Sequence, residues 1–341
     1  MYLNFYGLKE KPFNTTPDPK FLFLTAGHRE ALAQLVYGVQ EAKGFIVLSA
    51  DIGTGKTTLL QALLRQLDGG NTAVAYVFNS TLGFDGILEY MLRDFGIEKG
   101  AETRAARLFA LNNFLIERRR ANQNAVLIID EAQNLDPATL EEVRLLSNFE
   151  SPTGKLLQII LAGQSELNDK LALPELRQLR QRVALRCTIP ALDEEETREF
   201  IRTRLRIAGA RDVGIFTDRA VKRIAEWSGG IPRLINIGCD HCLLVGYADE
   251  RRHIDRDIVQ RAIKYFEAGE RPRGVFRRSA TSTAAPPQAA STIEWTLRGA
   301  AAVFVVGALV AVIGSGALDP WISPVTNIVN VAAQSAWGWM R

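Results

Sequence analysis

Five short apolar runs alternate along the chain with longer segments whose apolar residues recur at helical spacing. Short apolar runs between turn residues favour buried strands, which we expect at 45–50, 72–78, 125–130, 156–163 and 183–189. The periodic segments predict helices at 29–42, 56–67, 84–95, 103–121 and 137–149. Strands that alternate with helices form a parallel sheet with helices on both faces. The sequence therefore predicts an α/β fold built on a parallel five-stranded sheet.

The pattern changes after the fifth predicted strand. Residues 1–192 carry the strand and helix alternation, whereas residues 193–268 show helical periodicity only. This change predicts an α/β domain followed by a smaller α-helical domain. Residues 269–296 are rich in arginine and then in Ala, Ser, Thr and Pro, a composition typical of an extended linker.

The C-terminal region contains a long uncharged segment. Residues 299–318 hold twenty residues without a charge, and a helix of that length spans about 30 Å, the thickness of a bilayer core. We expect a single transmembrane helix over 297–318. The distribution of charge favours a cytoplasmic location for the part of the chain that precedes this helix, because five arginines precede the uncharged segment and few charges follow it. These arginines are Arg271, Arg273, Arg277, Arg278 and Arg298.

Residues 319–341 would form a short extracytoplasmic tail. Trp321, Trp337 and Trp339 suit a membrane interface. The tail either lies on the outer leaflet or re-enters it.

Composition adds few constraints. A net charge of +3 over 341 residues is too small to indicate nucleic-acid binding by itself. Three cysteines are too few for a disulfide framework and suggest a reducing compartment. Cys239 and Cys242 lack a second Cys/His pair, so we expect them to be packing residues rather than zinc ligands.

The segment "ADIGTGKT" (50–57) matches the phosphate-loop pattern G-x-x-x-x-G-K-[ST] except at Ala50. Such a loop directs backbone N–H groups and a helix N-terminus at a phosphate. Alanine can replace the first glycine if φ is negative there. The alternative is an ordinary glycine-containing turn between a strand and a helix. The residues predicted to bind a nucleotide are Asp51, Ile52, Gly53, Thr54, Gly55, Lys56, Thr57 and Thr58.

An acidic pair follows the third predicted strand. Thr57 and Asp130 would complete a Mg²⁺ shell, since this ion takes few protein ligands beside ATP phosphates. Glu131 would orient the attacking water. The alternative is two acids that cap a strand. Together with the loop, the pair predicts an ATPase that uses ATP and Mg²⁺.

Further polar residues follow the later strands. Gln164 ends the fourth strand, where it could hydrogen-bond water or phosphate. Arg177, Arg180 and Arg182 precede the fifth strand, and an arginine supplied by a neighbouring subunit can raise a phosphoryl-transfer rate by roughly 10³–10⁵. The alternative for these arginines is a solvated helix face. Arg233 begins a helix in the second domain.

This order of parts resembles that of the AAA+ ATPases, in which the helical domain is a lid. More narrowly, "FYGLKEKPFNTTPDPKFLF" (5–23) and "HREALAQLVYG" (28–38) resemble general secretion pathway protein A (the ExeA type). Those proteins are membrane-anchored AAA+ ATPases of bacterial secretion and envelope-polysaccharide systems. The resemblance covers about residues 1–268. The chain departs from the family at Ala50, and we expect it to lack the periplasmic peptidoglycan-binding domain.

The resemblance implies a role for each motif residue. It makes Lys56 and Thr57 ligands of phosphate and magnesium, and Asp130 a magnesium ligand. The remaining implied roles are water activation by Glu131 and first and second sensors at Gln164 and Arg233. The arginine finger is one of Arg177, Arg180 and Arg182, and Arg182 is preferred among them.

The leading hypothesis is a ring-forming ATPase anchored by a single span in the bacterial inner membrane. It would assemble or remodel an envelope secretion or exopolysaccharide export complex, with itself, the membrane and those export proteins as partners. A second hypothesis is a DNA-binding regulator of the transposition or replication-initiator type. Only under that alternative is DNA a partner, and the anchor and the missing winged-helix domain argue against it. A third is a slowly hydrolysing, nucleotide-gated assembly scaffold.

Overall fold

The computed structural model describes residues 2–16, 18–68, 71–78, 82–97, 103–152 and 154–267. Five parallel strands form its main sheet in the order β2-β3-β6-β1-β7, which confirms the predicted α/β fold and the predicted sheet. These strands are β1 (Phe45–Ala50), β2 (Thr72–Val77), β3 (Asn124–Ile129), β6 (Gln158–Gly163) and β7 (Val183–Ile189).

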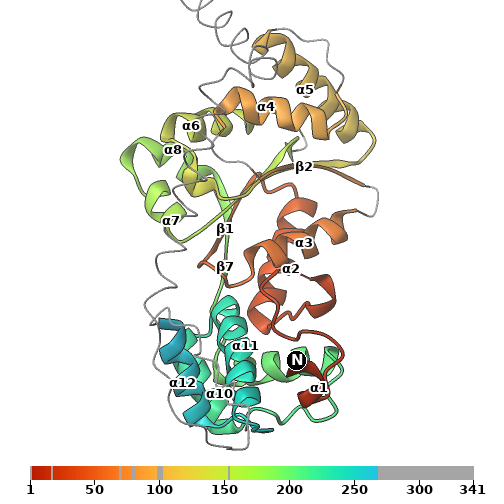
Figure 1. Ribbon diagram of the computed structural model, residues 1–341. Coiled ribbons are helices and arrows are strands. Elements are labelled where there is room, and N and C mark those ends of the chain that lie inside the picture. Colours follow the sequence, from red (N-terminus) through yellow and green to blue (C-terminus); the bar gives the residue numbers. More distant parts are fainter. Residues whose placement is uncertain are drawn as a thin grey trace, which may run out of the picture. The chain divides into compact units, whose positions relative to one another are not determined.

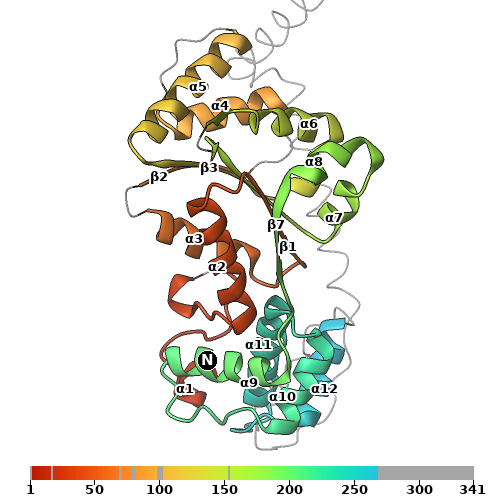
Figure 2. The ribbon, with the colours of Figure 1, turned by 180° about the vertical axis from the view of Figure 1, so that it is seen from behind.

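Helices cover both faces of this sheet (Figures 1 and 2). Successive side chains of a strand point to opposite faces, so Val47 and Leu127 lie in one core while Ile46 and Ile128 lie in another. The first core contains residues of α4 to α8, and the second contains residues of α2 and α3. Their bounds are α2 (Ala26–Gln40), α3 (Lys56–Leu67), α4 (Phe84–Asp94), α5 (Arg104–Arg120), α6 (Pro137–Leu146), α7 (Glu166–Leu171) and α8 (Arg177–Arg182).

A third hydrophobic core lies among helices after the sheet. The first of these helices begins with a capping box, in which Asp193 and Glu196 each hydrogen-bond the other's backbone N–H. The N-terminal helix α1 (Tyr2–Tyr6) also packs here, and the Tyr2 hydroxyl donates to Asp240 at 2.6 Å. The remaining helices are α9 (Glu194–Ile207), α10 (Asp218–Ser228), α11 (Pro232–Ala248) and α12 (Arg256–Glu267).

Some element boundaries differ from the sequence prediction. Helix α2 begins earlier, at Ala26, because the Thr25 hydroxyl accepts the backbone N–H of His28 and caps the helix. Helix α6 ends earlier, at Leu146, where the backbone N–H of Ser147 closes the last turn. The chain then enters a small hairpin that no periodicity indicates, because its strands have two residues each. They are β4 (Glu150–Ser151) and β5 (Gly154–Lys155).

The C-terminal predictions lie outside the described residues. These are the linker (269–296), the transmembrane helix (297–318) and the tail (319–341). Within the part of the chain that the structure describes, no helix has the length and apolar character needed to cross a membrane. The predicted boundaries of the α/β domain (1–192) and the helical domain (193–268) remain predictions.

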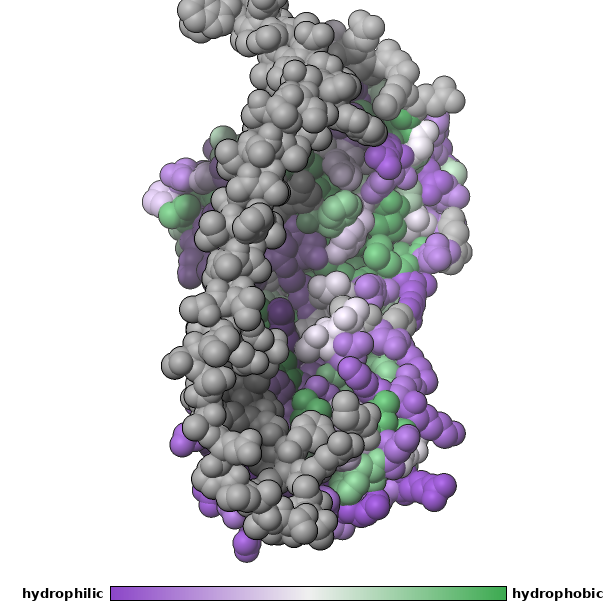
Figure 3. Space-filling model, in the orientation of Figure 1, coloured by the Kyte–Doolittle hydropathy of each residue, from purple (hydrophilic) through white to green (hydrophobic). Residues whose placement is uncertain are grey.

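Hydrophilic residues predominate along the outer edge of the described surface in Figure 3, with smaller groups of hydrophobic residues among them. Such a mixture is ordinary for a folded chain. One exposed apolar residue belongs to the predicted phosphate loop, since Ile52 is 60% exposed.

Candidate active site

The predicted phosphate loop joins the end of β1 to the start of α3. Gly53 and Gly55 adopt left-handed φ angles of +84° and +108°, which glycine tolerates without strain. Ala50 is the last residue of β1, pairs with Ile189 of β7 and has no positive φ. The extended backbone at Ala50 therefore accommodates its methyl group, so the missing first glycine leaves the turn intact.

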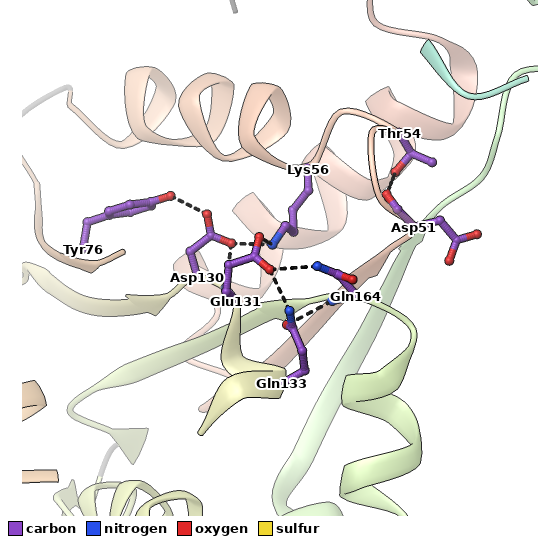
Figure 4. A network of polar contacts seen from close by, with 8 residues as sticks. All are labelled: Asp51, Thr54, Lys56, Tyr76, Asp130, Glu131, Gln133 and Gln164. Atoms are coloured by element: carbon purple, nitrogen blue, oxygen red, sulfur yellow. Dashed lines mark hydrogen bonds and ion pairs between the residues drawn. The ribbon is translucent and has the colours of Figure 1, made fainter. Parts of the chain in front are cut away.

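Lys56 lies between the two predicted acids (Figure 4). Its ammonium group donates to Asp130 Oδ1 at 2.7 Å and also to Glu131 Oε1. Its side chain is only 9% exposed, and a lysine this deeply buried requires charged or polar partners. The other Asp130 oxygen accepts the Tyr76 hydroxyl at 2.9 Å. Tyr76 was not predicted from the sequence, because its strand reads only as an apolar run.

Glu131 follows β3 in an unusual backbone conformation. Its φ of +53° lies in the left-handed region, which is uncommon for a residue with a side chain. Two amides donate to its Oε2 atom, Gln133 Nε2 at 2.6 Å and Gln164 Nε2 at 3.1 Å. Burial alone would raise the pKa of this carboxyl group, but the hydrogen bonds from Lys56, Gln133 and Gln164 outweigh it and lower the pKa. The carboxylate is therefore ionised at neutral pH.

Gln133 links the ends of two neighbouring strands. Its Oε1 atom accepts the backbone N–H of Gln164 at 3.2 Å while its amide group holds Glu131. A Cβ added to Gly163 would lie 2.7 Å from this Oε1 atom, so a larger residue there would displace the side chain. Gln133 was not predicted from the sequence, although it lies two positions after Glu131.

A cavity of about 520 Å³ adjoins these groups. All eight predicted loop residues line it, together with Glu131, Gln164 and Arg233. Two further walls were not predicted from the sequence. One comes from the N-terminal segment and consists of Asn14, Thr15, Thr16, Asp18, Phe21, Leu22 and Phe23. The other comes from α9, from α11 and from the residue two positions before α9. It includes Leu192, Phe200, Arg204 and Asn236.

Arg233 lies at the start of α11, directly against the loop. Its backbone N–H donates to Gly53 O at 3.2 Å. A Cβ on Gly53 would lie 2.8 Å from Arg233 Cβ, so glycine permits this close approach. The structure thus brings Arg233 to the cavity together with the loop, Glu131 and Gln164.

The three arginines before β7 are not part of the cavity wall. Arg182 ends α8 and donates to Asn148 Oδ1 at 2.8 Å and to Ser147 Oγ. Arg177 and Arg180 are exposed. An arginine finger acts on the site of a neighbouring subunit, so a position away from its own cavity is compatible with that role, which stays a prediction for Arg182.

His28 supports the loop from α2 and was not predicted as a site residue. It is 3% exposed, and its Nε2–H donates to Thr54 O at 3.0 Å. Because Nε2 is then the protonated nitrogen, Nδ1 accepts the Thr25 hydroxyl at 2.9 Å. Burial lowers the pKa of His28 more than its hydrogen bond to Thr54 raises it.

The His28 environment predicts a pH dependence of stability. Below the ordinary histidine pKa of about 6.5, the unfolded chain binds a proton that the folded chain excludes. The free energy of unfolding should therefore fall as the pH drops below 6.5, with a slope of at most about 1.4 kcal/mol per pH unit from this residue. Denaturant unfolding at pH 7.5 and 5.5 measures it. The fall should shrink in His28→Gln and persist in the exposed control His253→Gln, whereas equal falls in both variants would contradict it.

The glycine loop, the buried lysine and the acidic pair on this sheet define an α/β P-loop fold. Residues 39–171 match the AAA domain family. Over 278 residues (81% of the chain), the sequence is 38% identical to general secretion pathway protein A of Aeromonas hydrophila. The chain spans about half (50%) of the length of that relative.

Two solved structures show the same fold. Cdc6p from Pyrobaculum aerophilum matches with a TM-score of 0.54 and 19% identity, over 73% of this chain and 71% of that one. The ORC2 protein of Aeropyrum pernix, solved as ADPNP–ADP complexes, matches with a TM-score of 0.54 and 19% identity. The match covers 75% of this chain and 71% of that one. At this identity the likeness concerns the fold alone.

Proposed function

We propose that the chain binds ATP with Mg²⁺ in the cavity and hydrolyses it. One observation carries the proposal, namely that Lys56 meets Asp130 and Glu131 beside a cavity lined by all eight loop residues. A glycine-containing turn that binds no ligand would need neither a buried lysine nor two acids that contact the ammonium group of that lysine.

The residues present fit the two ligands. The left-handed glycines leave the loop backbone free of Cβ atoms where it would face phosphate oxygens. The Thr57 hydroxyl lines the cavity, and the Asp130 carboxylate is held by Lys56 and Tyr76. Oxygen atoms of this kind are the ligands that Mg²⁺ prefers. The ion, when bound, would neutralise phosphate charge.

The carboxylate network supports the remaining roles that we propose in hydrolysis. Glu131, ionised and fixed by two amides, would orient the attacking water and accept its proton. Gln164 would hold that water or a phosphate oxygen through its amide. Lys56 would exchange its bond to Glu131 for phosphate oxygens, which frees the carboxylate for water.

We extend the proposal to the assembly and its setting. Arg182 would complete the site of a neighbouring copy in a ring, and its position away from its own cavity is compatible with that role. Arg233 would couple the helical domain to the nucleotide through the loop at Gly53. The relation to general secretion pathway protein A supports a role in secretion. The site of work in this proposal is an envelope secretion or exopolysaccharide export complex at the bacterial inner membrane.

ATP binding by the full chain tests the first step. Lys56→Ala removes the buried cation, so we expect ATP affinity to fall by roughly 30- to 1000-fold. Titration calorimetry with a slowly hydrolysed ATP analogue and Mg²⁺ measures it. Lys43→Ala is the matched control, because Lys43 is exposed and interacts with Tyr37 instead. Equal affinity in both variants would contradict the proposal.

A further inference from the structure

Asn236 is a buried polar residue that the account of hydrolysis leaves unused. It lies on α11, is only 7% exposed and lines the cavity. Its Oδ1 atom is buried and has no hydrogen-bond partner in the described structure. A buried carboxamide oxygen without a partner costs folding free energy, and buried polar groups are otherwise almost always bonded. The residue lines the cavity, and rotation about the last torsion of its side chain would turn this unused acceptor toward a group that enters.

The position of Asn236 on α11 indicates which part of a nucleotide it would meet. It follows Arg233 by three residues, about one turn, and so lies on the same face of the helix. Arg233 packs against the phosphate loop at Gly53. Asn236 consequently faces the cavity further from the loop, where a nucleoside would lie if the phosphates are held by Lys56.

Part of the cavity wall suits a planar base. Phe21, Leu192 and Phe200 line the cavity and are each at most 6% exposed. The guanidinium of Arg204 lies over the rings of Phe21 and Phe200, 4.9 and 5.3 Å from their centroids. Apolar and aromatic walls with a few polar groups are typical of pockets for ring systems.

The carboxamide matches adenine better than guanine. It presents one acceptor and one donor side by side, and rotation about its last torsion exchanges them. Adenine offers a donor at N6 beside an acceptor at N7, which is complementary to both. Guanine offers two acceptors at the corresponding edge, so only one of them can meet the single donor.

We propose that Asn236 hydrogen-bonds the adenine edge of the bound nucleotide and sets a preference for adenine over guanine nucleotides. The inference rests on the proposed function, since it requires a nucleotide in this cavity. It adds a specificity-determining residue in the helical domain. Such a residue is needed because the phosphate loop faces the phosphates, which all nucleoside triphosphates share.

Competition binding by the full chain tests the inference with ATP, GTP and ITP, which share their phosphates and ribose. A bidentate contact between asparagine and adenine predicts that the wild type prefers ATP roughly 5- to 150-fold. Asn236→Leu should lower ATP affinity more than GTP and ITP affinity, and so reduce this preference, because adenine loses two hydrogen bonds and the other two bases lose one. Asn168→Leu is the matched control, because Asn168 is exposed on α7 and outside the cavity wall.

The melting temperature of each nucleotide-free variant shows whether that variant is folded. Asn236→Leu removes an unpartnered oxygen, so its melting temperature should equal or exceed that of the wild type. Asn236→Asp keeps the shape of the side chain but loses the donor, so it should keep only the contact with adenine N6 and bind ATP more weakly than the wild type.

Three results would overturn the inference. If Asn236→Leu weakens all three nucleotides equally, the residue contacts ribose or only stabilises the helix. If the ratio of ATP to GTP affinity does not change, the residue does not read the base, while the proposed function stands. If the wild type binds none of the three nucleotides, the proposed function fails and the inference fails with it.

Discussion

Replacing Glu131 with glutamine is expected to lower ATP turnover by roughly 10²–10⁴-fold while ATP binding stays within a few-fold of the wild type. The glutamine keeps the shape of the side chain and its bonding to neighbouring amides, but it cannot accept a proton from water. Glu131 is suited to that task, because hydrogen bonds from Lys56, Gln133 and Gln164 hold it ionised.

Phosphate release and nucleotide binding, measured on the same preparation, separate the two effects. Glu226→Gln is the matched control, since Glu226 is an exposed acid paired with Arg223 on α10. It should retain wild-type turnover. A Glu131→Gln variant that hydrolyses ATP at the wild-type rate would show that another group activates the water.

Replacing Arg182 with alanine is expected to lower turnover by roughly 10³–10⁵-fold under conditions where the wild type assembles. The reason is that a guanidinium supplied across a subunit interface would contact two oxygens of the transferred phosphoryl group at once. Arg182→Lys keeps the charge but loses the planar fork, so it should recover only part of the rate.

The neighbouring arginines provide internal controls for this position. Arg177 and Arg180 lie on the same short helix and are exposed, so Arg177→Ala and Arg180→Ala should change turnover little. Wild-type turnover per chain should also rise with protein concentration, because the complete site would need two copies. Turnover that is independent of concentration and of Arg182 would contradict a shared site.

The sheet and the loop could be predicted because their signals are local. The central strands β1, β3 and β6 are runs of mostly apolar residues buried on both faces. Lys56 follows Gly55 directly at the start of a helix. Asp130 and Glu131 could be predicted for the same reason, since they end a buried strand. In a parallel sheet such strand ends meet at one edge, which brings Gln164 to Glu131.

The remaining features depend on contacts that no local pattern encodes. Tyr2 hydrogen-bonds Asp240, 238 positions away, so the packing of the N-terminal segment on the helical core could not be read from its own sequence. Tyr76 lies in an ordinary strand, and its contact with Asp130 arises only when β2 and β3 pair. The unpartnered oxygen of Asn236 is likewise a property of the packed helices.

Mixing Glu131→Gln chains with Arg182→Ala chains tests the central claim most directly. Each variant alone lacks one group of the proposed shared site. In a mixed ring, some interfaces join an Arg182→Ala chain, which keeps Glu131, to a Glu131→Gln chain, which supplies Arg182. The account predicts that ATP turnover by the mixture exceeds the sum of the two variants measured separately. Turnover equal to that sum, with both variants shown to co-assemble, would contradict a site completed by a neighbouring copy.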